Sequence, residues 1–486
     1  MIQPRPDAKQ IDHATKQKIR EHYDRIATDR ARYRKINRYY YQQLFAQLKS
    51  IVQPGKKILE VGCADGFVLQ KLKPDRGVGI DLSEAMIEAA KERAQRKQLP
   101  HLEFHQADIE TNRITETFDY IILSDVVGNL LDIQIALENL QPACTGSTRV
   151  LIQYHSMLWD PALKTAERLR LKMPQPLHNW LAPTDIDHFL NLSNFECISF
   201  DRRMLLPKYV PLFSNLINRY IAPLPLINAF CLTNLFVIRR RPVETDQTYS
   251  TTILIPSRNE RGNIRPAIDR IPDFGGEQEI LFVDGHSTDG TPEEIKQVIN
   301  DFPDKNIKLF TQPGKGKGDA VRHGFAKATK DVLMILDADL TVPPEDLPKF
   351  YDAIASGKGE FINGTRLVYP MENEAMRFLN ILGNKFFSVV LSWLLNQPLK
   401  DTLCGTKVLL RTDYERIAAG RSYFGDFDPF GDFDLIFGAA RLNMKISEVP
   451  IRYRDRTYGT TNISRFRHGW LLLKMTAVAF RKLKLT

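Results

Sequence analysis

The sequence has few cysteines and no long uninterrupted apolar run. Its five cysteines are scattered and lack the C-x-x-C spacing of a metal site, so a disulfide scaffold and a zinc module are excluded and a reduced, cytoplasmic chain is expected. No apolar core follows the first basic residues, so we expect no signal peptide. Hydrophobic residues make up 43% and charged residues 26% of the chain, which excludes a disordered or collagen-like protein.

Two apolar stretches bear on membrane contact. Residues 209–237 are interrupted by asparagine, arginine and proline, and residues 378–399 by asparagine and lysine. Neither offers the roughly 20 uninterrupted apolar residues that span a bilayer. The second fits an amphipathic helix with a broad apolar face, which leaves both core packing and contact with lipid or a lipid-linked substrate open. We expect a protein that lies on a membrane surface without crossing it.

The formal net charge is +9, and the excess of basic residues is concentrated near the C-terminus. From Arg452 to the last residue there are nine lysines and arginines against the single acid Asp455. This imbalance favours a phosphate-rich or anionic-lipid partner over an ordinary solvated face. No recognition-helix, zinc or RNA-binding signature is present, so we expect no nucleic-acid partner.

The length of 486 residues exceeds what one hydrophobic core normally organises. A polar stretch begins at Arg239, after an apolar run and before a new β-like run at Thr251. We interpret it as a boundary, with domains at 1–241 and 251–486 and a linker at 242–250. Both halves alternate short Val/Ile/Leu runs with helical patterns, which predicts two α/β domains with mainly parallel sheets.

A glycine-rich loop follows the first predicted strand of the N-terminal half. The run 57–61 is strand-like, and Gly62 and Gly66 come between it and a helical segment. Glycine lets a ligand approach the backbone without a Cβ clash. The next strand, 77–81, ends in Asp81, a carboxylate suited to accept the hydroxyls of a ribose.

These motifs, over residues 55–155, resemble class I S-adenosylmethionine-dependent methyltransferases, although Ala64 replaces the commonest middle glycine of their loop. The resemblance implies a Rossmann-like fold that binds S-adenosylmethionine and requires no metal. A Rossmann domain for NAD is the alternative, but it expects three glycines. By similarity, the cofactor-binding residues are Glu60, Gly62, Cys63, Gly66, Asp81, Leu82, Asp108 and Ile109.

The methyl acceptor is not named by the sequence. His155 follows the fifth strand, near where acceptors sit in this fold, and is open to interpretation as a base or as a structural histidine. The aromatic segment around Tyr33 and residues 39–41 either caps the cofactor or packs between helices, and we favour helix packing.

In the C-terminal half, three predicted strands (251–255, 279–283 and 332–336) each end in a polar loop. Such loops meet at one edge of an open α/β sheet, where ligands bind. Asp337 and Asp339 follow the third strand, and two carboxylates at this spacing repel each other unless a cation lies between them. Oxygen ligands suit Mg²⁺ or Mn²⁺, which in turn neutralises a diphosphate leaving group.

Residues 250–470 resemble family 2 glycosyltransferases of the GT-A fold, and most of all the dolichyl- and polyprenyl-phosphate glycosyltransferases. The resemblance implies a UDP- or GDP-linked sugar donor, a divalent metal on Asp337 and Asp339, and phosphate contacts from Arg366 and Arg456. The donor-site loop 314–319 lacks the spacing of a P-loop. The remaining implied nucleotide-sugar residues are Pro256, Arg258, Glu260, Asp284, Lys317 and Ala338.

Three positions depart from that family's usual pattern. Gly285 stands where many members have a second aspartate, which puts base recognition in doubt. Thr341 occupies the place of a glutamine frequent in mannosyltransferases, which weakens the assignment of the sugar, and Asn462 replaces a lysine.

Two glycosyl acceptors are consistent with the sequence. A lipid phosphate is already anionic and needs cations to hold it, which the C-terminal arginines supply. A glycan hydroxyl needs a carboxylate base, for which Asp432 and Asp434 are candidates unless they cap a helix at 435–442. We favour the lipid phosphate, in a bifunctional enzyme peripheral to the cytoplasmic face of a membrane. In the alternative, the N-terminal domain modifies the same glycan or serves only as a scaffold.

Overall fold

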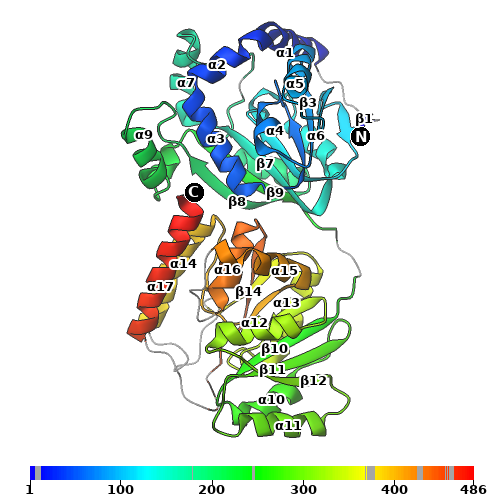
Figure 1. The fold of residues 1–486 in the computed structure, drawn as a ribbon, viewed down its shortest axis with the longest axis vertical. Coiled ribbons are helices and arrows are strands. Elements are labelled where there is room, and N and C mark those ends of the chain that lie inside the picture. Colours follow the sequence, from blue (N-terminus) through cyan, green and yellow to red (C-terminus); the bar gives the residue numbers. More distant parts are fainter. Residues whose placement is uncertain are drawn as a thin grey trace. The chain divides into compact units, whose positions relative to one another are not determined.

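The computed structural model describes residues 1–5, 12–177, 179–243, 247–366, 368, 378–423, 431–454, 456, 458 and 465–485. The chain forms two compact units, Met1–Arg241 and Pro242–Lys484. Each unit is an α/β layer structure with helices on the faces of a mixed sheet (Figure 1). The predicted fold class is confirmed.

The N-terminal unit contains a seven-stranded sheet in the order β4-β3-β2-β6-β7-β9-β8. Its strands are parallel except β9, which is antiparallel to both of its neighbours. A separate antiparallel pair is formed by β1 (Ile2–Pro4) and β5 (Asn112–Ile114). The strands of the main sheet are β2 (Lys57–Val61), β3 (Arg76–Asp81), β4 (Leu102–Gln106), β6 (Phe118–Ser124), β7 (Cys144–His155), β8 (Phe195–Arg203) and β9 (Thr233–Arg240).

The helices of this unit begin where the sequence offers capping side chains. Asp12 accepts the backbone N–H of Thr15 at the start of α1, and Ser83 accepts that of Met86 at the start of α5. The α-helices are α1 (His13–Ile26), α2 (Arg30–Ile36), α3 (Arg38–Ile51), α4 (Phe67–Leu72), α5 (Glu84–Arg96), α6 (Ile133–Leu140), α7 (Asp160–Arg168), α8 (Pro183–Leu192) and α9 (Phe213–Leu216). Shorter helical turns are η1 (Ala27–Asp29), η2 (Val127–Asn129), η3 (Gln141–Ala143), η4 (Met157–Trp159), η5 (Ile217–Ile221) and η6 (Ile227–Phe230).

The C-terminal unit also has a seven-stranded sheet, in the order β12-β11-β10-β13-β15-β14-β16. The strands from β12 to β13 are parallel, and β15 is antiparallel to both of its neighbours. The strands are β10 (Thr251–Ser257), β11 (Gln278–Asp284), β12 (Ile307–Thr311), β13 (Val332–Ile335), β14 (Phe361–Thr365), β15 (Lys407–Leu410) and β16 (Ile446–Pro450).

The helices of this unit include α14 and α17, which contact each other (Figure 1). The α-helices are α10 (Arg261–Arg270), α11 (Thr291–Asp301), α12 (Lys317–Lys327), α13 (Leu347–Ala355), α14 (Phe378–Leu395), α15 (Arg411–Ala419), α16 (Asp432–Arg441) and α17 (Arg465–Ala479). Shorter turns are η7 (Pro344–Asp346), η8 (Arg421–Tyr423) and η9 (Phe480–Lys484).

Each sheet is buried on both faces, because alternate residues of a strand point to opposite sides. In β10, Leu254 packs into one core cluster, whereas Ile253 and Ile255 pack into the other. In β2, Leu59 and Ile58 divide in the same way. The near-continuous apolar strands that the sequence shows are therefore the central strands of two-sided sheets.

Candidate functional sites

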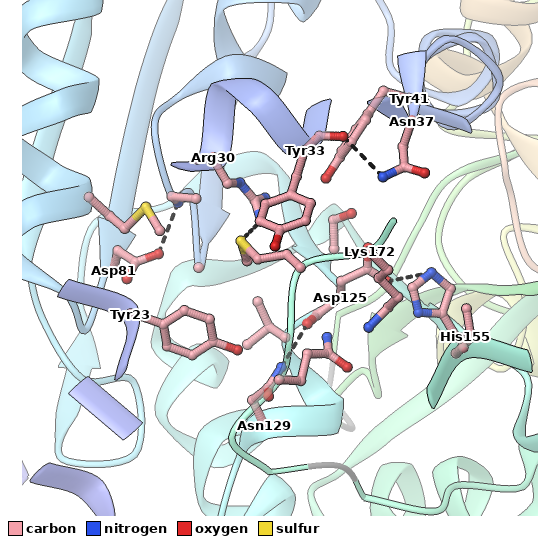
Figure 2. A pocket seen from close by; sticks show the side chains of 18 of the residues that line it. Tyr23, Arg30, Tyr33, Asn37, Tyr41, Asp81, Asp125, Asn129, His155 and Lys172 are labelled. Atoms are coloured by element: carbon pink, nitrogen blue, oxygen red, sulfur yellow. Dashed lines mark hydrogen bonds and ion pairs between the residues drawn. The ribbon is translucent and has the colours of Figure 1, made fainter. Parts of the chain in front are cut away.

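The N-terminal unit has a cavity of about 430 Å³ at the carboxyl edge of its sheet. It lies where the strand order reverses between β2 and β6, the position at which open α/β sheets bind ligands. The loops after β2, β3, β4 and β6 line it, together with side chains of α1, α2 and α3 (Figure 2).

The loop after β2 depends on its two glycines. Gly62 lines the cavity with a φ of 69°, and a Cβ at this position would overlap the side chain of Val126. Gly66 has a φ of 68° just before α4, and a Cβ there would lie 2.7 Å from the ring of Phe104. Glycine adopts this positive φ without strain, so both positions favour it. Gly66 shapes the loop but is not among the residues that line the cavity.

Asp81, at the end of β3, is held by backbone donors of the same edge. Its carboxylate accepts the N–H groups of Ala64 and Ser83, each at 2.9 Å, and it lines the cavity. Burial raises the pKa of Asp81, and the two backbone hydrogen bonds oppose that rise. The carboxylate is thus fixed in orientation at the cavity wall, where the sequence predicts a contact with ribose.

Leu82, Asp108 and Ile109 also line the cavity, as the predicted cofactor contacts require. Asp108 lies 3.0 Å from the ammonium of Lys16, which comes from α1 and also pairs with the buried Glu110. Burial lowers the pKa of Lys16, and Asp108 opposes that change. Lys16 was not predicted, because a lysine on a polar helix ordinarily faces solvent.

Glu60 and Cys63 lie beneath the loop and are not among the cavity-lining residues. They are 2% and 3% exposed, and burial raises the pKa of both groups well above the ordinary values. A direct contact of these two side chains with the cofactor therefore stays a prediction.

A polar network occupies another part of the cavity wall. The hydroxyl of Tyr40 lies 3.0 Å from Asp125 Oδ2 and 2.9 Å from His155 Nε2, and Asp125 Oδ1 is 3.6 Å from the same nitrogen. Burial and the charge of Asp125 raise the pKa of Tyr40 well above its usual range. Asp125 adopts a positive φ of 56°, which is uncommon for a residue other than glycine.

The N-terminal helices contribute more to the cavity than the sequence analysis anticipated. Tyr33, Tyr40 and Tyr41 line it, while Tyr40 and Tyr41 also pack in the core, so the predicted helix packing and a place at the cavity wall occur together. Tyr39 does pack, with its hydroxyl donating to Asn215 at 3.0 Å. Further lining residues that the sequence analysis missed are Tyr23, Arg30, Asn37, Asn129 and Lys172 (Figure 2).

In the C-terminal unit, charged side chains gather after β13. The ammonium of Lys317 lies 2.5 Å from Asp337 Oδ1 and 4.0 Å from Asp432 Oδ1, and Lys407 lies 3.7 Å from Asp432. Burial alone would raise the pKa of Asp337, but Lys317 lowers it. The chain passes very close here, because a Cβ on Gly405 would overlap both Asp337 and Lys317.

The second carboxylate, Asp339, is held by groups of its own. Arg456 Nη2 donates to it at 2.7 Å, and the hydroxyl of Thr341 donates to its Oδ1 at 2.8 Å. Arg456 also lies 3.4 Å from Glu260. Burial raises the pKa of Glu260, and Arg456 opposes that rise. Thr341, which departs from the usual pattern of the resembled family, therefore orients Asp339.

The remaining predicted donor residues lie at or just after the ends of β10, β11 and β13. Pro256 lies in β10, and Arg258 follows it with an exposed side chain. Asp284 ends β11, is buried, and accepts the N–H of Ser287 at 3.2 Å. Ala338 is buried between the two aspartates of the β13 loop. Since β10 pairs in parallel with both β11 and β13, these loops share one edge of the sheet.

Asp432 and Asp434 occupy different environments. Burial raises the pKa of Asp432 despite Lys317 and Lys407, and its Oδ1 has no hydrogen-bond partner among the described residues. Asp434 instead pairs with Arg421, at 2.7 Å. The helix begins at Asp432 itself with Gly431 as N-cap, so neither aspartate caps it through its side chain, and the predicted start at residue 435 was wrong. Only Asp432 belongs to the Lys317 cluster.

Arg366 has a partner within the fold. Its Nε and Nη2 donate to the two oxygens of Asp401 at 2.7 and 2.9 Å, and the residue is 8% exposed. A contact with a donor phosphate remains a prediction for this residue. Asp455, Asn462 and the side chains of Arg465 and Arg467, which belong to the C-terminal stretch considered in the sequence analysis, lie outside the described residues.

The apolar side chains of helix α14 lie partly in the core and partly in solvent. Phe387, Leu391 and Leu394 are buried in the core, whereas Phe386 and Val389 are 54% and 63% exposed. Core packing therefore holds for the buried side of the helix, and contact of the exposed side with lipid or a lipid-linked substrate stays a prediction. In the part of the chain that the structure describes, no helix combines the length and apolar character needed to cross a bilayer.

The donor set at the aspartates fits a hard cation bound together with a phosphate ligand. Asp337 and Asp339 supply carboxylate oxygens, and Mg²⁺ typically takes one or two carboxylates plus substrate phosphates. Among the described residues, no group of three or more His, Cys, Asp and Glu side chains could hold a metal ion.

Comparison with known families assigns a domain to each half. Residues 252–417 match the model of glycosyl transferase family 2, and residues 53–187 match that of a methyltransferase domain. Dolichol-phosphate mannosyltransferase of Pyrococcus furiosus is 38% identical over 136 residues, which are 28% of this chain and 38% of that protein. Dolichyl-phosphate hexose transferase of Haloferax volcanii is 31% identical over 212 residues, which are 43% of this chain and 82% of that protein.

The solved structures that resemble the N-terminal half include an S-adenosylmethionine-dependent methyltransferase of Thermotoga maritima, described as a possible histamine N-methyltransferase. The match covers 46% of this chain and 100% of the Thermotoga chain. Its sequence identity is 12% and its TM-score is 0.36. The family matches and the Haloferax relative establish that the chain belongs to glycosyl transferase family 2 through its C-terminal half and carries a methyltransferase domain in its N-terminal half.

Proposed function

We propose that the chain is a bifunctional enzyme. Its C-terminal unit transfers a sugar, with inversion and with a divalent metal, from a UDP- or GDP-linked donor to a polyprenyl phosphate. Its N-terminal unit transfers a methyl group from S-adenosylmethionine. The observation that carries the glycosyl proposal is the cluster of Asp337, Asp339, Lys317 and Arg456 at the edge where β10, β11 and β13 end.

This cluster provides what a nucleoside diphosphate leaving group requires. Asp337 and Asp339 would hold Mg²⁺ or Mn²⁺, which when bound neutralises the diphosphate. Lys317 contacts Asp337 and Arg456 contacts Asp339, so both cations lie where they would supply positive charge to the phosphate oxygens of the donor. Gly405 keeps the chain close enough for Asp337 and Lys317 to meet, and Thr341 fixes the orientation of Asp339.

The lipid-phosphate acceptor is supported by two observations. The names of both relatives above refer to dolichol or dolichyl phosphate. In addition, α14 and α17 expose large apolar side chains, Phe386 and Val389 on the first and Trp470 and Leu473 on the second. Such a surface suits peripheral attachment at the cytoplasmic face of a membrane. A glycan hydroxyl is the alternative acceptor, favoured by the buried Asp432, which would then serve as the base.

The methyl-transfer proposal rests on the cavity of the N-terminal unit. Gly62 and Asp81 would approach the cofactor from the loops after β2 and β3, and Asp108 and Ile109 would border its base. Tyr40, Asp125 and His155 form a network able to accept a proton from a hydroxyl acceptor. The acceptor itself stays open, and a cofactor-binding scaffold without turnover is the alternative.

A panel of radiolabelled UDP- and GDP-sugars with Mn²⁺ tests the glycosyl half. We expect metal-dependent release of nucleotide from one donor and its loss in Asp339→Asn. The exposed Asp352 of α13 offers a matched control, Asp352→Asn, which should retain activity. Absence of metal-dependent turnover with every donor would contradict the proposal.

Calorimetric titration with S-adenosylhomocysteine tests the methyl half. Asp81→Asn should weaken binding by about tenfold or more, because hydrogen bonds to a charged group contribute about 1.5–3 kcal/mol. Equal binding by the wild type and the variant would contradict the placement of the cofactor. Tight binding with no methyl transfer to any glycan or lipid fraction would support the scaffold.

A further inference from the structure

A segment between β8 and β9 leaves the N-terminal sheet and returns to it. It departs after Met204 and rejoins at Leu232, whose N–H donates to the carbonyl of Met204 at 2.8 Å. We call residues 205–231 the excursion. It contains α9, η5 and η6, and α9 stands away from the sheet (green in Figure 1).

The helical part of the excursion has inverted polarity. Ser214 and Asn218, one helical turn apart, are 0% and 7% exposed. Ser214 accepts the N–H of Val210 at 2.8 Å, and Asn218 accepts those of Leu205 and Leu206 at 2.9 and 2.8 Å. These two polar side chains therefore face inward and tie the segment together.

The apolar side chains of the same segment face outward. Phe213, Leu216 and Tyr220 are 62%, 54% and 48% exposed. They recur at the three- and four-residue spacing of one helix face, opposite the buried Ser214 and Asn218. In a water-facing helix this distribution would be reversed. The excursion thus presents a surface suited to an apolar environment.

Two similar turns add the most exposed leucines. Val210-Pro211-Leu212-Phe213 and Leu224-Pro225-Leu226-Ile227 share an apolar-Pro-Leu-apolar pattern. Leu212 and Leu226 are each 85% exposed and have φ of 67° and 69°. A positive φ is disfavoured for leucine, and at Leu212 it comes with the hydrogen bond of a strained γ-turn, from Phe213 N–H to the Pro211 carbonyl at 2.8 Å. Each turn therefore projects a leucine side chain away from the protein, where burial in an apolar partner would stabilise it.

The charged side chains within this stretch of the sequence are of one sign. From residue 202 to residue 243 the sequence has no Asp or Glu, whereas Lys208 and Arg219 are exposed within the excursion. Tyr209 and Tyr220, also exposed, are amphipathic aromatic residues of the kind enriched at membrane interfaces. Basic and aromatic residues around inserted leucines match an anionic bilayer surface.

We infer that the excursion is a membrane-docking surface that inserts Leu212, Leu226 and the α9 face into the interface of an anionic bilayer. The inference goes beyond the proposed function, because it assigns membrane contact to the methyltransferase unit and requires neither transfer activity. Pro207, Lys208 and Leu232, at the two ends of the excursion, line the cavity. Docking therefore places that side of the cavity next to the lipid.

Vesicle flotation of the full chain tests the inference. The probes are vesicles of phosphatidylcholine alone and of phosphatidylcholine mixed with phosphatidylglycerol. We expect stronger binding to the mixed vesicles, and a loss of about tenfold for each leucine, about a hundredfold in all, in the double variant Leu212→Ser/Leu226→Ser. Leu192→Ser, at a leucine of α8 that is 63% exposed, is the matched control and should bind as the wild type does.

The double variant also distinguishes a bilayer from a second copy of the chain as the partner of this surface. Both leucines are exposed, so serine should leave the melting temperature unchanged and keep the fold. Wild-type flotation by the double variant overturns the inference. Light scattering then identifies a second copy as the occupant if the wild type is a dimer and the double variant a monomer. An equal loss of binding in Leu192→Ser also overturns it, since the effect is then not specific to the excursion.

Discussion

Replacing Lys317 by methionine tests whether its ammonium is the cation that holds the aspartate cluster together. Lys317 contacts Asp337 at 2.5 Å and Asp432 at 4.0 Å, with side chains that are 27%, 26% and 9% exposed. Removing one partner of a fully buried ion pair costs about 3–5 kcal/mol. Because these groups keep part of their exposure, we discount the expected loss to about 2 kcal/mol.

A loss of about 2 kcal/mol corresponds to a decrease of about 4–8 °C in the melting temperature of a unit of this size. Scanning calorimetry measures it, and a transition that S-adenosylhomocysteine shifts marks the N-terminal unit as an internal reference. Lys315→Met is the matched control, since Lys315 lies exposed on the same loop. Mn²⁺ should stabilise Lys317→Met more than the wild type, because the metal and the ammonium neutralise the same carboxylate.

The effect of Lys317→Met should depend on pH. Lys317 lowers the pKa of Asp337 below the ordinary value of 3.8, so its stabilisation is present above that pH and is lost as the pH falls through the lowered pKa. The difference between the wild type and the variant should be full at neutral pH and shrink as the carboxyls protonate. An unchanged melting temperature at neutral pH, or a difference that grows in acid, would refute this reasoning.

Three further changes separate the roles of neighbouring groups. Gly405→Ala places a Cβ on Asp337 and Lys317 and should weaken UDP or GDP binding by about tenfold or more, measured by titration with Mn²⁺; unchanged affinity would contradict the close approach. Asp432→Asn should lower glycosyl transfer, whereas Asp434→Asn should not; equal effects in kinetics would mean that the separation of their environments is irrelevant. Tyr40→Phe should slow methyl transfer by about a hundredfold with S-adenosylhomocysteine affinity retained, and an unchanged rate would exclude the network from catalysis.

The strands and their terminal loops were predictable because they depend on local patterns. Apolar runs that end in Asp81, Asp284 and Asp337 identify parallel strands, and parallel strands bring their carboxyl ends to one edge. The two fold classes and the division into a methyltransferase and a glycosyltransferase half follow from those patterns and from the motif residues that they position.

The groups that the sequence analysis missed reach the sites from distant elements. Lys16, Arg30 and Tyr40 come from helices that precede β2, the first strand of the main sheet, and no local spacing relates them to Asp108 or His155. A helix with basic and aromatic residues has the same local pattern whether it covers a cavity or a core. Their placement depends on how the helices pack.

Asp432 and Asp434 were equivalent candidates in the sequence, but the structure places them in different environments. Asp432 and Asp434 are two residues apart on α16, so they point to different sides, and their partners Lys407 and Arg421 decide which one joins the cluster. In the excursion, Asn218 counted in the sequence only as an interruption of an apolar stretch, whereas the structure buries it and leaves Leu212 and Leu226 exposed.

The central claim is metal-dependent transfer of a sugar to a polyprenyl phosphate, and transfer of label into the organic phase tests it most directly. The full chain is incubated with Mn²⁺, the radiolabelled donor that it turns over, and a polyprenyl phosphate. We predict acid-labile, organic-soluble label that chelation of the metal and Asp339→Asn both abolish. Metal-dependent donor turnover with no organic label, and label instead on a soluble glycan, would contradict the lipid-phosphate acceptor.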